Sequence, residues 1–385
     1  PRRSREPGGD PVKIVTVLGT RPEIIRLSRV IAKLDECADH FLVHTGQNYD
    51  RRLSRIFFDE LGVREPDLHL GIESSDFGEQ VGKILTGCHR VFEDHRPDRM
   101  LILGDTNSGL AALAARRVGM PVYHMEAGNR CFDDRVPEEV NRRVIDHAST
   151  ILMPYTERSR QNLLDEGIAS SRILVTGNPI KEVIDHHRGQ IDASTALDEL
   201  DVTPQGYFLV TLHRAENVDI PGRLEGFVTS LRDLAGAYEK PVIVSCHPRT
   251  RAKMNEFGIG SAGEDVRFLP PFAFFDFLSL ETHAFCILSD SGTVQEEACL
   301  LSVPNVTLRD VTERPETVEC GSNVLAGADP DRIRQLVQMV TTHRRAWTPP
   351  PEYLASDVAD TVCRILTSFR PPDAAERAWR DRSPS

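Results

Sequence analysis

The sequence lacks the closely spaced cysteines of a zinc site or a disulfide framework. Its eight cysteines are scattered from Cys37 to Cys363, and none forms a CxxC pair. The adjacent His186 and His187 lie in a polar segment and favour no metal site. We therefore expect no metal, reduced thiols and a cytoplasmic protein.

Clusters of basic residues and long apolar stretches are also missing. The 385-residue chain has a formal net charge of -12 and no basic run beyond its first few residues, whereas nucleic-acid binders hold phosphates with clustered Lys and Arg. Residues 1–11, PRRSREPGGDP, have no apolar stretch after them. They predict a disordered tail, with neither a secretory signal nor a membrane span. We expect neither a nucleic-acid partner nor a membrane partner.

Apolar, β-branched runs alternate with helix-period segments along nearly the whole chain. The runs cover residues 14–18, 100–103, 121–125, 173–175, 208–212 and 242–244. Because the strands of parallel sheets are buried on both faces, such runs predict an α/β fold with parallel sheets. A polar segment near 186–204 interrupts the alternation. It indicates a junction between two doubly wound domains, with a ligand cleft between them at the carboxyl ends of the strands.

The stretch from Asp290 to Glu316 has the pattern of a phosphate-binding helix start followed by a charged loop. An apolar run over 285–288 ends at Asp290-Ser291-Gly292, and a helical pattern follows at once. At such a helix start, Ser291 and Gly292 could hold a diphosphate through backbone N–H groups and the helix dipole. We expect Glu296 and Glu297 in the first turn and Arg314 as a cation on the next loop. The alternative is an ordinary capped helix with a solvated acidic turn.

The first predicted strand leads into a second helix start, GTRPE. Thr20 and Glu23 have the spacing of a capping box, which places Arg21 at the N-terminus of the helix. Arg21 could bind an anionic ligand there, or it could simply be solvated beside the cap.

Further polar residues follow the ends of other predicted strands. Asp105 and Glu126 each follow a strand, Glu138 begins a helix after Pro137, and His213 follows the strand at 208–212. Carboxylates clustered at strand ends favour a functional site. The alternatives are that Asp105 caps a helix, that the glutamates are solvated turn residues, and that His213 is structural.

These segments together resemble the non-hydrolysing UDP-N-acetylglucosamine 2-epimerase family. Nine blocks follow the family's order and approximate spacing, namely GTRPE at Gly19, TGQ at Thr45, GDT at Gly104, EAG at Glu126, PEE at Pro137, TGN at Thr176, HR at His213, DSG with QEE from Asp290, and TERPE at Thr312.

The resemblance implies two Rossmann-like domains facing each other across a cleft, as in GT-B glycosyltransferases, and a homodimer. We expect a tail at 1–11, an N-terminal domain at 12–187, a junction at 188–204, a UDP-binding domain at 205–352 and a C-terminal helix within 353–385 that crosses back to the N-terminal domain. No cofactor is implied, because GTRPE lacks the glycine fingerprint of dinucleotide sites.

The family's reaction interconverts UDP-N-acetylglucosamine and UDP-N-acetylmannosamine. The C2 proton has no adjacent carbonyl to acidify it, so we expect elimination of UDP to a 2-acetamidoglucal, followed by re-addition. By resemblance, the catalytic groups are Asp105, Glu126, Glu138 and His213. The UDP contacts are Arg21, His213, Ser291, Gly292, Arg314 and, at the ribose, Glu297.

The sequence departs from the family's pattern in two places. The bacterial site for an activating second UDP-N-acetylglucosamine is altered at Asn48, Tyr49, Ala215 and Ser245, so we predict no obligatory activation by substrate. The segment from Glu126 to Glu138 is two residues shorter than the usual form. It resembles the branch that acts on modified sugar nucleotides of the 6-deoxytalose or diacetamidoglucuronate type.

Three other functions share some of these features. A GT-B glycosyltransferase would share the diphosphate contacts without needing all three carboxylates. A hydrolysing 2-epimerase would release free sugar and UDP, and a UDP-sugar sensor would bind without turnover.

Overall fold

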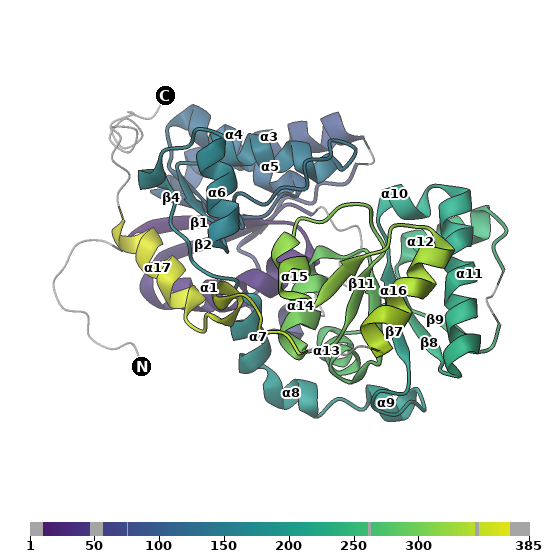
Figure 1. Ribbon diagram of the computed structural model, residues 1–385. Helices are drawn as coiled ribbons and strands as arrows, with labels where there is room; N and C mark the ends of the chain where they lie inside the picture. Colours follow the sequence, from purple (N-terminus) through teal and green to yellow (C-terminus); the bar gives the residue numbers. More distant parts are fainter. Residues whose placement is uncertain (1–10, 47–56, 75, 261–262, 343–345, 370–385) are drawn as a thin grey trace. The chain divides into compact units, whose positions relative to one another are not determined.

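The computed structural model describes residues 11–46, 57–74, 76–260, 263–342 and 346–369, which divide into two compact units (Figure 1). Unit 1 takes the described residues of Pro1–Gly128, Val140–Thr176 and Asp357–Ser385, and unit 2 those of Asn129–Glu139 and Gly177–Ser356. The segment 188–204, expected as a junction, is part of unit 2. The expected tail, apart from Pro11, lies outside the described residues, as do Asn48 and Tyr49.

Unit 1 is built on a parallel sheet with the strand order β3-β2-β1-β4-β5-β6. This is the order of a doubly wound sheet, in which the strands are added first on one side of β1 and then, from β4 onward, on the other side. The strands are β1 (Lys13–Leu18), β2 (Asp39–His44), β3 (Leu68–His69), β4 (Arg99–Leu103), β5 (Val122–Met125) and β6 (Ile151–Met153).

One strand of unit 1 was predicted in the wrong place. The run at 173–175 forms only an isolated bridge between Ile173 and Leu152, and the edge strand is β6. The run follows a 3₁₀ turn, Ser170–Arg172, and it lies beside β6 through two backbone hydrogen bonds, from the Leu174 N–H to the Leu152 carbonyl at 2.9 Å and from the Thr176 N–H to the Pro154 carbonyl at 3.0 Å.

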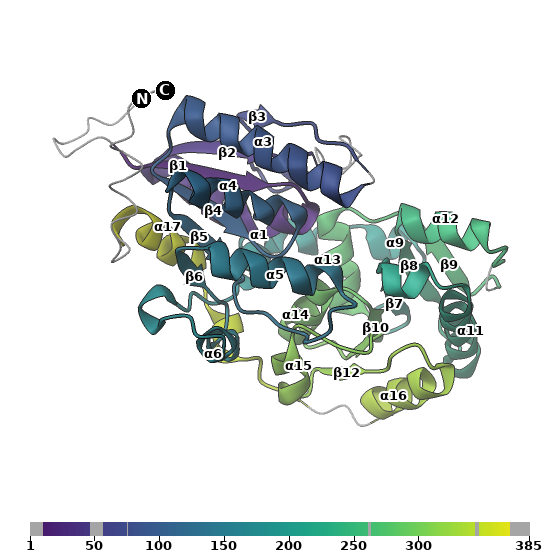
Figure 2. The ribbon, with the colours of Figure 1, turned by 90° about the horizontal axis from the view of Figure 1, so that it is seen from above.

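Helices cover both faces of the sheet of unit 1 (Figure 2). Val15, Met100 and Val122 pack against α3, α4 and Ile145 of α5, whereas α1 and α17 lie on the other face. The helices are α1 (Arg21–Cys37), α3 (Phe77–His95), the 3₁₀ helix η1 (Asn107–Leu110), α4 (Ala111–Val118), α5 (Pro137–Ala148), α6 (Glu157–Asp165) and α17 (Val358–Ser368).

The C-terminal helix α17 packs against α1. Tyr123 on β5 donates its hydroxyl hydrogen to the carbonyl of Phe369 at 2.9 Å, and Arg99 on β4 donates to the carbonyl of Leu366. The end of the described chain is therefore an integral part of unit 1.

Unit 2 repeats the doubly wound arrangement. Its parallel strands have the order β12-β11-β10-β7-β8-β9, so strands are again added on one side of β7 first and, from β10 onward, on the other side. The two sheets confirm the predicted α/β class. The strands are β7 (Phe208–Leu212), β8 (Val242–Cys246), β9 (Val266–Leu269), β10 (Cys286–Ser289), β11 (Asn305–Thr307) and β12 (Asn323–Leu325).

Two apolar layers enclose the sheet of unit 2. One joins Val210 and its neighbours to α11, α12 and α16, and the other joins Leu209 and Ile287 to α9, α13 and α14. The helices are α7 (Ile180–His186), α8 (Arg188–Asp192), α9 (Ala196–Glu199), α10 (Ala215–Val218), α11 (Pro221–Tyr238), α12 (Pro248–Glu256), α13 (Phe274–His283), α14 (Gly292–Leu301), α15 (Pro315–Cys320), α16 (Pro330–Thr342) and the 3₁₀ helix η3 (Pro351–Leu354).

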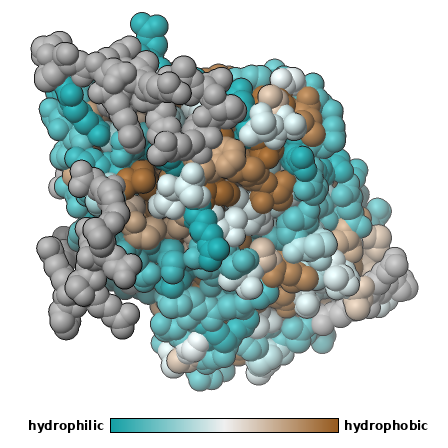
Figure 3. Space-filling model, turned by 90° about the vertical axis from the view of Figure 1, so that its left-hand side faces the viewer, coloured by the Kyte–Doolittle hydropathy of each residue, from teal (hydrophilic) through white to brown (hydrophobic). Residues whose placement is uncertain are grey.

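The face of the molecule in Figure 3 carries hydrophobic areas set among hydrophilic residues. Within the described ranges, we find no helix with the length and apolar character needed to cross a bilayer.

Candidate functional site

The start of α1 is held by a buried carboxylate. Glu23 accepts hydrogen bonds from the backbone N–H groups of Gly19 and Thr20, at 3.0 and 2.8 Å, and from the Thr20 hydroxyl at 2.7 Å. The predicted capping box is therefore confirmed. Thr106, in the loop after β4, donates to the same carboxylate at 3.1 Å. Burial raises the pKa of Glu23 to about 7, even though these hydrogen bonds lower it.

Two arginines of α1 lie near this start. Arg21 is the first residue of the helix, as predicted, and its Cζ lies 5.5 Å from the ring centroid of Phe57. Arg26 is only 2% exposed and forms an ion pair with Glu126. Sequence analysis missed Arg26, although a charged residue among the apolar positions of an amphipathic helix was a usable signal.

Asp105 and Glu126 lie just beyond the ends of the neighbouring strands β4 and β5. Asp105 binds the Arg142 guanidinium of α5, at 2.5 Å from Nη2 and 3.1 Å from Nε. It does not cap the helix that follows, since the N-cap of η1 is Thr106. A Cβ placed on Gly104 would lie 3.8 Å from the Glu126 carboxylate. These contacts bring the loops that carry Asp105 and Glu126 close together in unit 1.

In unit 2, Asp290 anchors the loop after β7. Its buried carboxylate accepts from the backbone N–H groups of His213 and Arg214, at 3.0 and 2.9 Å, and from the Asn217 side chain at 3.1 Å. The imidazole Nδ1 of His213 lies 3.1 Å from the same carboxylate, and the side chain is 38% exposed. Burial alone would raise the pKa of Asp290, but His213 and the hydrogen bonds lower it to about 2.

The turn Asp290-Ser291-Gly292 leads into α14 as predicted. Ser291 is the N-cap and Gly292 the first helical residue. The Ser291 N–H donates to the Ser289 hydroxyl at 3.0 Å. A Cβ placed on Gly292 would lie 3.8 Å from Arg314 Nη2, so a cation lies beside the start of the helix.

The prediction that Glu296 and Glu297 occupy the first turn of α14 is wrong. The helix begins at Gly292, and its first turn contains no acidic residue. Glu296 is fully buried and forms an ion pair with Arg314. Glu297 is also buried, and burial together with the charge of Glu297 raises the pKa of the nearby Glu281. Both carboxylates therefore belong to the interior of unit 2 and not to a solvated turn.

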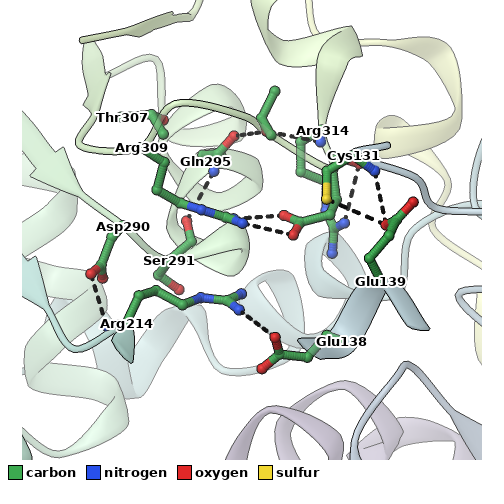
Figure 4. Close-up of polar contacts among 12 residues, drawn as sticks. Cys131, Glu138, Glu139, Arg214, Asp290, Ser291, Gln295, Thr307, Arg309 and Arg314 are labelled. Atoms are coloured by element: carbon green, nitrogen blue, oxygen red, sulfur yellow. Dashed lines mark hydrogen bonds and ion pairs between the residues drawn. The ribbon is translucent and has the colours of Figure 1, made fainter. Parts of the chain in front are cut away.

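Buried polar contacts fix the loop that carries Arg314 (Figure 4). Arg309 donates two hydrogen bonds to the Glu313 carboxylate, at 2.7 and 2.9 Å. Thr312 donates to the Gln295 side chain of α14 at 2.6 Å. Sequence analysis missed Arg309 and Gln295, since nothing in their spacing indicates which loop they contact.

Glu138 lies at the start of α5, in the part of the helix that belongs to unit 2. Its carboxylate lies 3.2 Å from Nη1 of Arg214, and Figure 4 shows the two side chains pointing toward each other. The structure thus places Arg21, Asp105 and Glu126 in unit 1, and Glu138, His213, Ser291, Gly292, Glu297 and Arg314 in unit 2.

No group of three or more His, Cys, Asp or Glu side chains that could hold a metal ion occurs in the part of the chain that the structure describes. In unit 2, the helix start at Ser291 and Gly292 and the neighbouring Arg314 can bind a diphosphate through backbone N–H groups and a cation. In unit 1, the carboxylates of Asp105 and Glu126 can move protons.

Comparison with known proteins identifies close relatives. The family model described as UDP-N-acetylglucosamine 2-epimerase matches residues 32–367. A UDP-N-acetylglucosamine 2-epimerase of Methanococcus maripaludis is 42% identical over 345 residues, which cover 88% of this chain and 94% of the relative. A UDP-2,3-diacetamido-2,3-dideoxy-D-glucuronate 2-epimerase of Pseudomonas aeruginosa is 38% identical, with 84% and 90% covered. The crystal structure of the Methanocaldococcus jannaschii UDP-GlcNAc 2-epimerase in complex with UDP-GlcNAc and UDP has a TM-score of 0.88 and 39% identity, with 92% of this chain and 99% of that chain covered.

Proposed function

The chain belongs to the UDP-N-acetylglucosamine 2-epimerase family, and from this premise we propose that it interconverts UDP-N-acetylglucosamine and UDP-N-acetylmannosamine. The reaction proceeds by loss of UDP from C1 as the C2 proton is removed, which gives a 2-acetamidoglucal. The proton then returns on the opposite face and UDP adds again. No cofactor takes part.

The observation that carries this proposal is the arrangement of Asp105 and Glu126 at adjacent strand ends, each paired with an arginine. General acid and base catalysis at C2 needs carboxylates held in fixed positions. Glu138 is the third carboxylate of the proposal, and His213 acts beside the departing phosphate.

The proposed UDP contacts in unit 2 are Ser291 and Gly292 at the start of α14, Arg314 beside them, His213 and, at the ribose, Glu297. The N-terminus of a helix and a neighbouring cation both stabilise the negative charge that develops on a departing diphosphate. Arg21, at the start of α1, completes the set.

NMR in deuterated water tests the reaction directly. With UDP-N-acetylglucosamine as substrate, we expect deuterium at C2 and a growing UDP-N-acetylmannosamine signal. Sugar transferred to an acceptor without deuterium would instead mean a glycosyltransferase, and free N-acetylmannosamine a hydrolysing epimerase. Tight UDP binding without any turnover would mean a sensor.

Three variants test the roles of the carboxylates. Asp105→Asn, Glu126→Gln and Glu138→Gln should lose deuterium incorporation but still bind UDP in calorimetry. Glu157→Gln, at the exposed start of α6, is the matched control and should behave as the wild type. Loss of UDP affinity in the three variants would show that their roles are wrongly assigned.

A modified sugar nucleotide is the second candidate substrate. The relative from Pseudomonas aeruginosa carries the name of a diacetamidoglucuronate epimerase, and the shortened segment between Glu126 and Glu138 favours this branch. Parallel assays with 6-deoxy and 2,3-diacetamido UDP-sugars decide between the substrates by their relative kcat/KM.

We also propose that the protein works in the cytoplasm as a homodimer. All eight cysteines are free thiols, which fits a reducing compartment. The dimer rests on resemblance to the family, and light scattering coupled to gel filtration tests it.

A further inference from the structure

In the segment Asn129–Glu139, a buried carboxylate at the start of α5 binds the backbone of the preceding loop. Glu139 is fully buried. Its two oxygens accept the backbone N–H groups of Cys131 and Phe132, each at 3.0 Å, and the Cys131 Sγ lies 3.3 Å from Oε2. Figure 4 shows Glu139 directed at Cys131. A buried backbone N–H that loses its acceptor costs free energy, so these two hydrogen bonds hold the loop against Glu139.

The loop needs such an anchor because its backbone is strained. Phe132 has φ +56°, a left-handed conformation that a bulky side chain rarely adopts. Its side chain is 72% exposed, so burial of the ring contributes little to holding it there. Strained residues of this kind persist where the surroundings fix them, and they concentrate at functional sites.

We propose that Glu139 is a positioning residue, whose carboxylate holds the loop and the first turn of α5 so that Glu138 is presented to Arg214. Consecutive residues of a helix point about 100° apart, so a helix start fixed through Glu139 also sets the direction of Glu138. The partner is fixed as well, because the Arg214 backbone N–H donates to the buried Asp290. This inference rests on the proposed function of Glu138 and adds a residue that acts through it.

The test compares Glu139→Gln with Asp133→Asn in the full chain. The amide of Gln has one acceptor oxygen, so one of the two N–H groups in the loop would face an NH₂ group. Asp133 lies in the same loop and pairs with the exposed Arg135, which makes it a matched control. Because a small misplacement of a catalytic group is costly, we expect kcat of Glu139→Gln to fall about 100-fold, with UDP affinity unchanged. Asp133→Asn should keep the wild-type kcat.

Thiol labelling gives a readout that does not depend on activity. Cys131 is buried and Cys37 is exposed, so peptide mass spectrometry can follow both thiols in one sample. In Glu139→Gln, a maleimide should label Cys131 faster than in the wild type, while Cys37 reacts at the same rate in both.

The proposal is overturned if kcat of Glu139→Gln matches the wild type, or if the labelling of Cys131 does not change. If Glu139→Gln has both a lower melting temperature and a weaker affinity for UDP, Glu139 has a merely structural role. If Glu139→Gln does not fold, Glu139→Asp decides, since it keeps the carboxyl group but shortens the reach to the loop. A wild type without turnover of any UDP-sugar would refute the proposed function, whereas labelling of Cys131 would still decide whether Glu139 holds the loop.

Discussion

The buried carboxyl of Glu23 predicts an unusual dependence of stability on pH. Burial raises its pKa from 4.5 to about 7 in the folded protein, so the folded state keeps a proton that the unfolded state loses. The stability contributed by the protonated group is complete below about pH 4.5 and is lost as the pH rises through 7. The difference between the two pKa values corresponds to about 3 kcal/mol.

Replacing Glu23 with Gln removes this titration and leaves other groups in place. We expect the free energy of unfolding of Glu23→Gln, relative to that of the wild type, to rise by about 3 kcal/mol between pH 4.5 and pH 8. Urea unfolding of both proteins at the two pH values, monitored by the same spectroscopic signal, measures the difference between their free energies of unfolding. Glu36→Gln, at an exposed position of α1, should show no such change.

A constant difference between wild type and Glu23→Gln across this range would refute the reasoning. It would mean that the hydrogen bonds from Gly19, Thr20 and Thr106 keep the carboxylate charged despite its burial.

Three further predictions concern other buried charges and regulation. Glu126→Met separates Arg26 from its buried counter-charge and should lower the free energy of unfolding by about 3 kcal/mol in urea titrations, and the double variant Arg26→Met/Glu126→Met should recover most of the loss. The lowered pKa of Asp290 contributes stability that is present above pH 3.8 and lost as the pH falls toward about 2, so acid unfolding of Asp290→Asn should lack about 2 kcal/mol of that dependence. Because Ala215 and Ser245 depart from the family's regulatory pattern, UDP-N-acetylmannosamine should be epimerised without added UDP-N-acetylglucosamine, and an assay that required the addition would contradict this.

The sequence was sufficient to predict the class of the fold and most of its longer central strands, but it missed β2 (Asp39–His44), whose ends are polar. Buried parallel strands such as β1, β4 and β7 consist of five or six residues, mostly apolar, and this pattern can be recognised in the sequence alone. Edge strands of two or three residues, such as β3 and β12, are too short to carry a periodicity. Their pairing depends on neighbours that only the folded sheet supplies.

The candidate site was predictable where a residue follows a strand or begins a helix. Asp105, Glu126 and Ser291 lie at such positions. Pairs such as Arg26 with Glu126 were not predictable, since the partners are 100 residues apart and no local pattern links them. The error at Glu296 has another origin: α14 begins at Gly292 as predicted, so Glu296 is the fifth residue of the helix and lies beyond its first turn.

The packing of α17 against α1 has a consequence for the order in which the protein is made. When a ribosome has added residues up to Ser356, every segment of unit 2 has been synthesised, whereas unit 1 still lacks the helix that covers α1. Multidomain chains usually complete their N-terminal domain first. Here the part encoded later can be complete first, and unit 1 must wait, with the face of α1 that contacts α17 uncovered, until α17 leaves the exit tunnel.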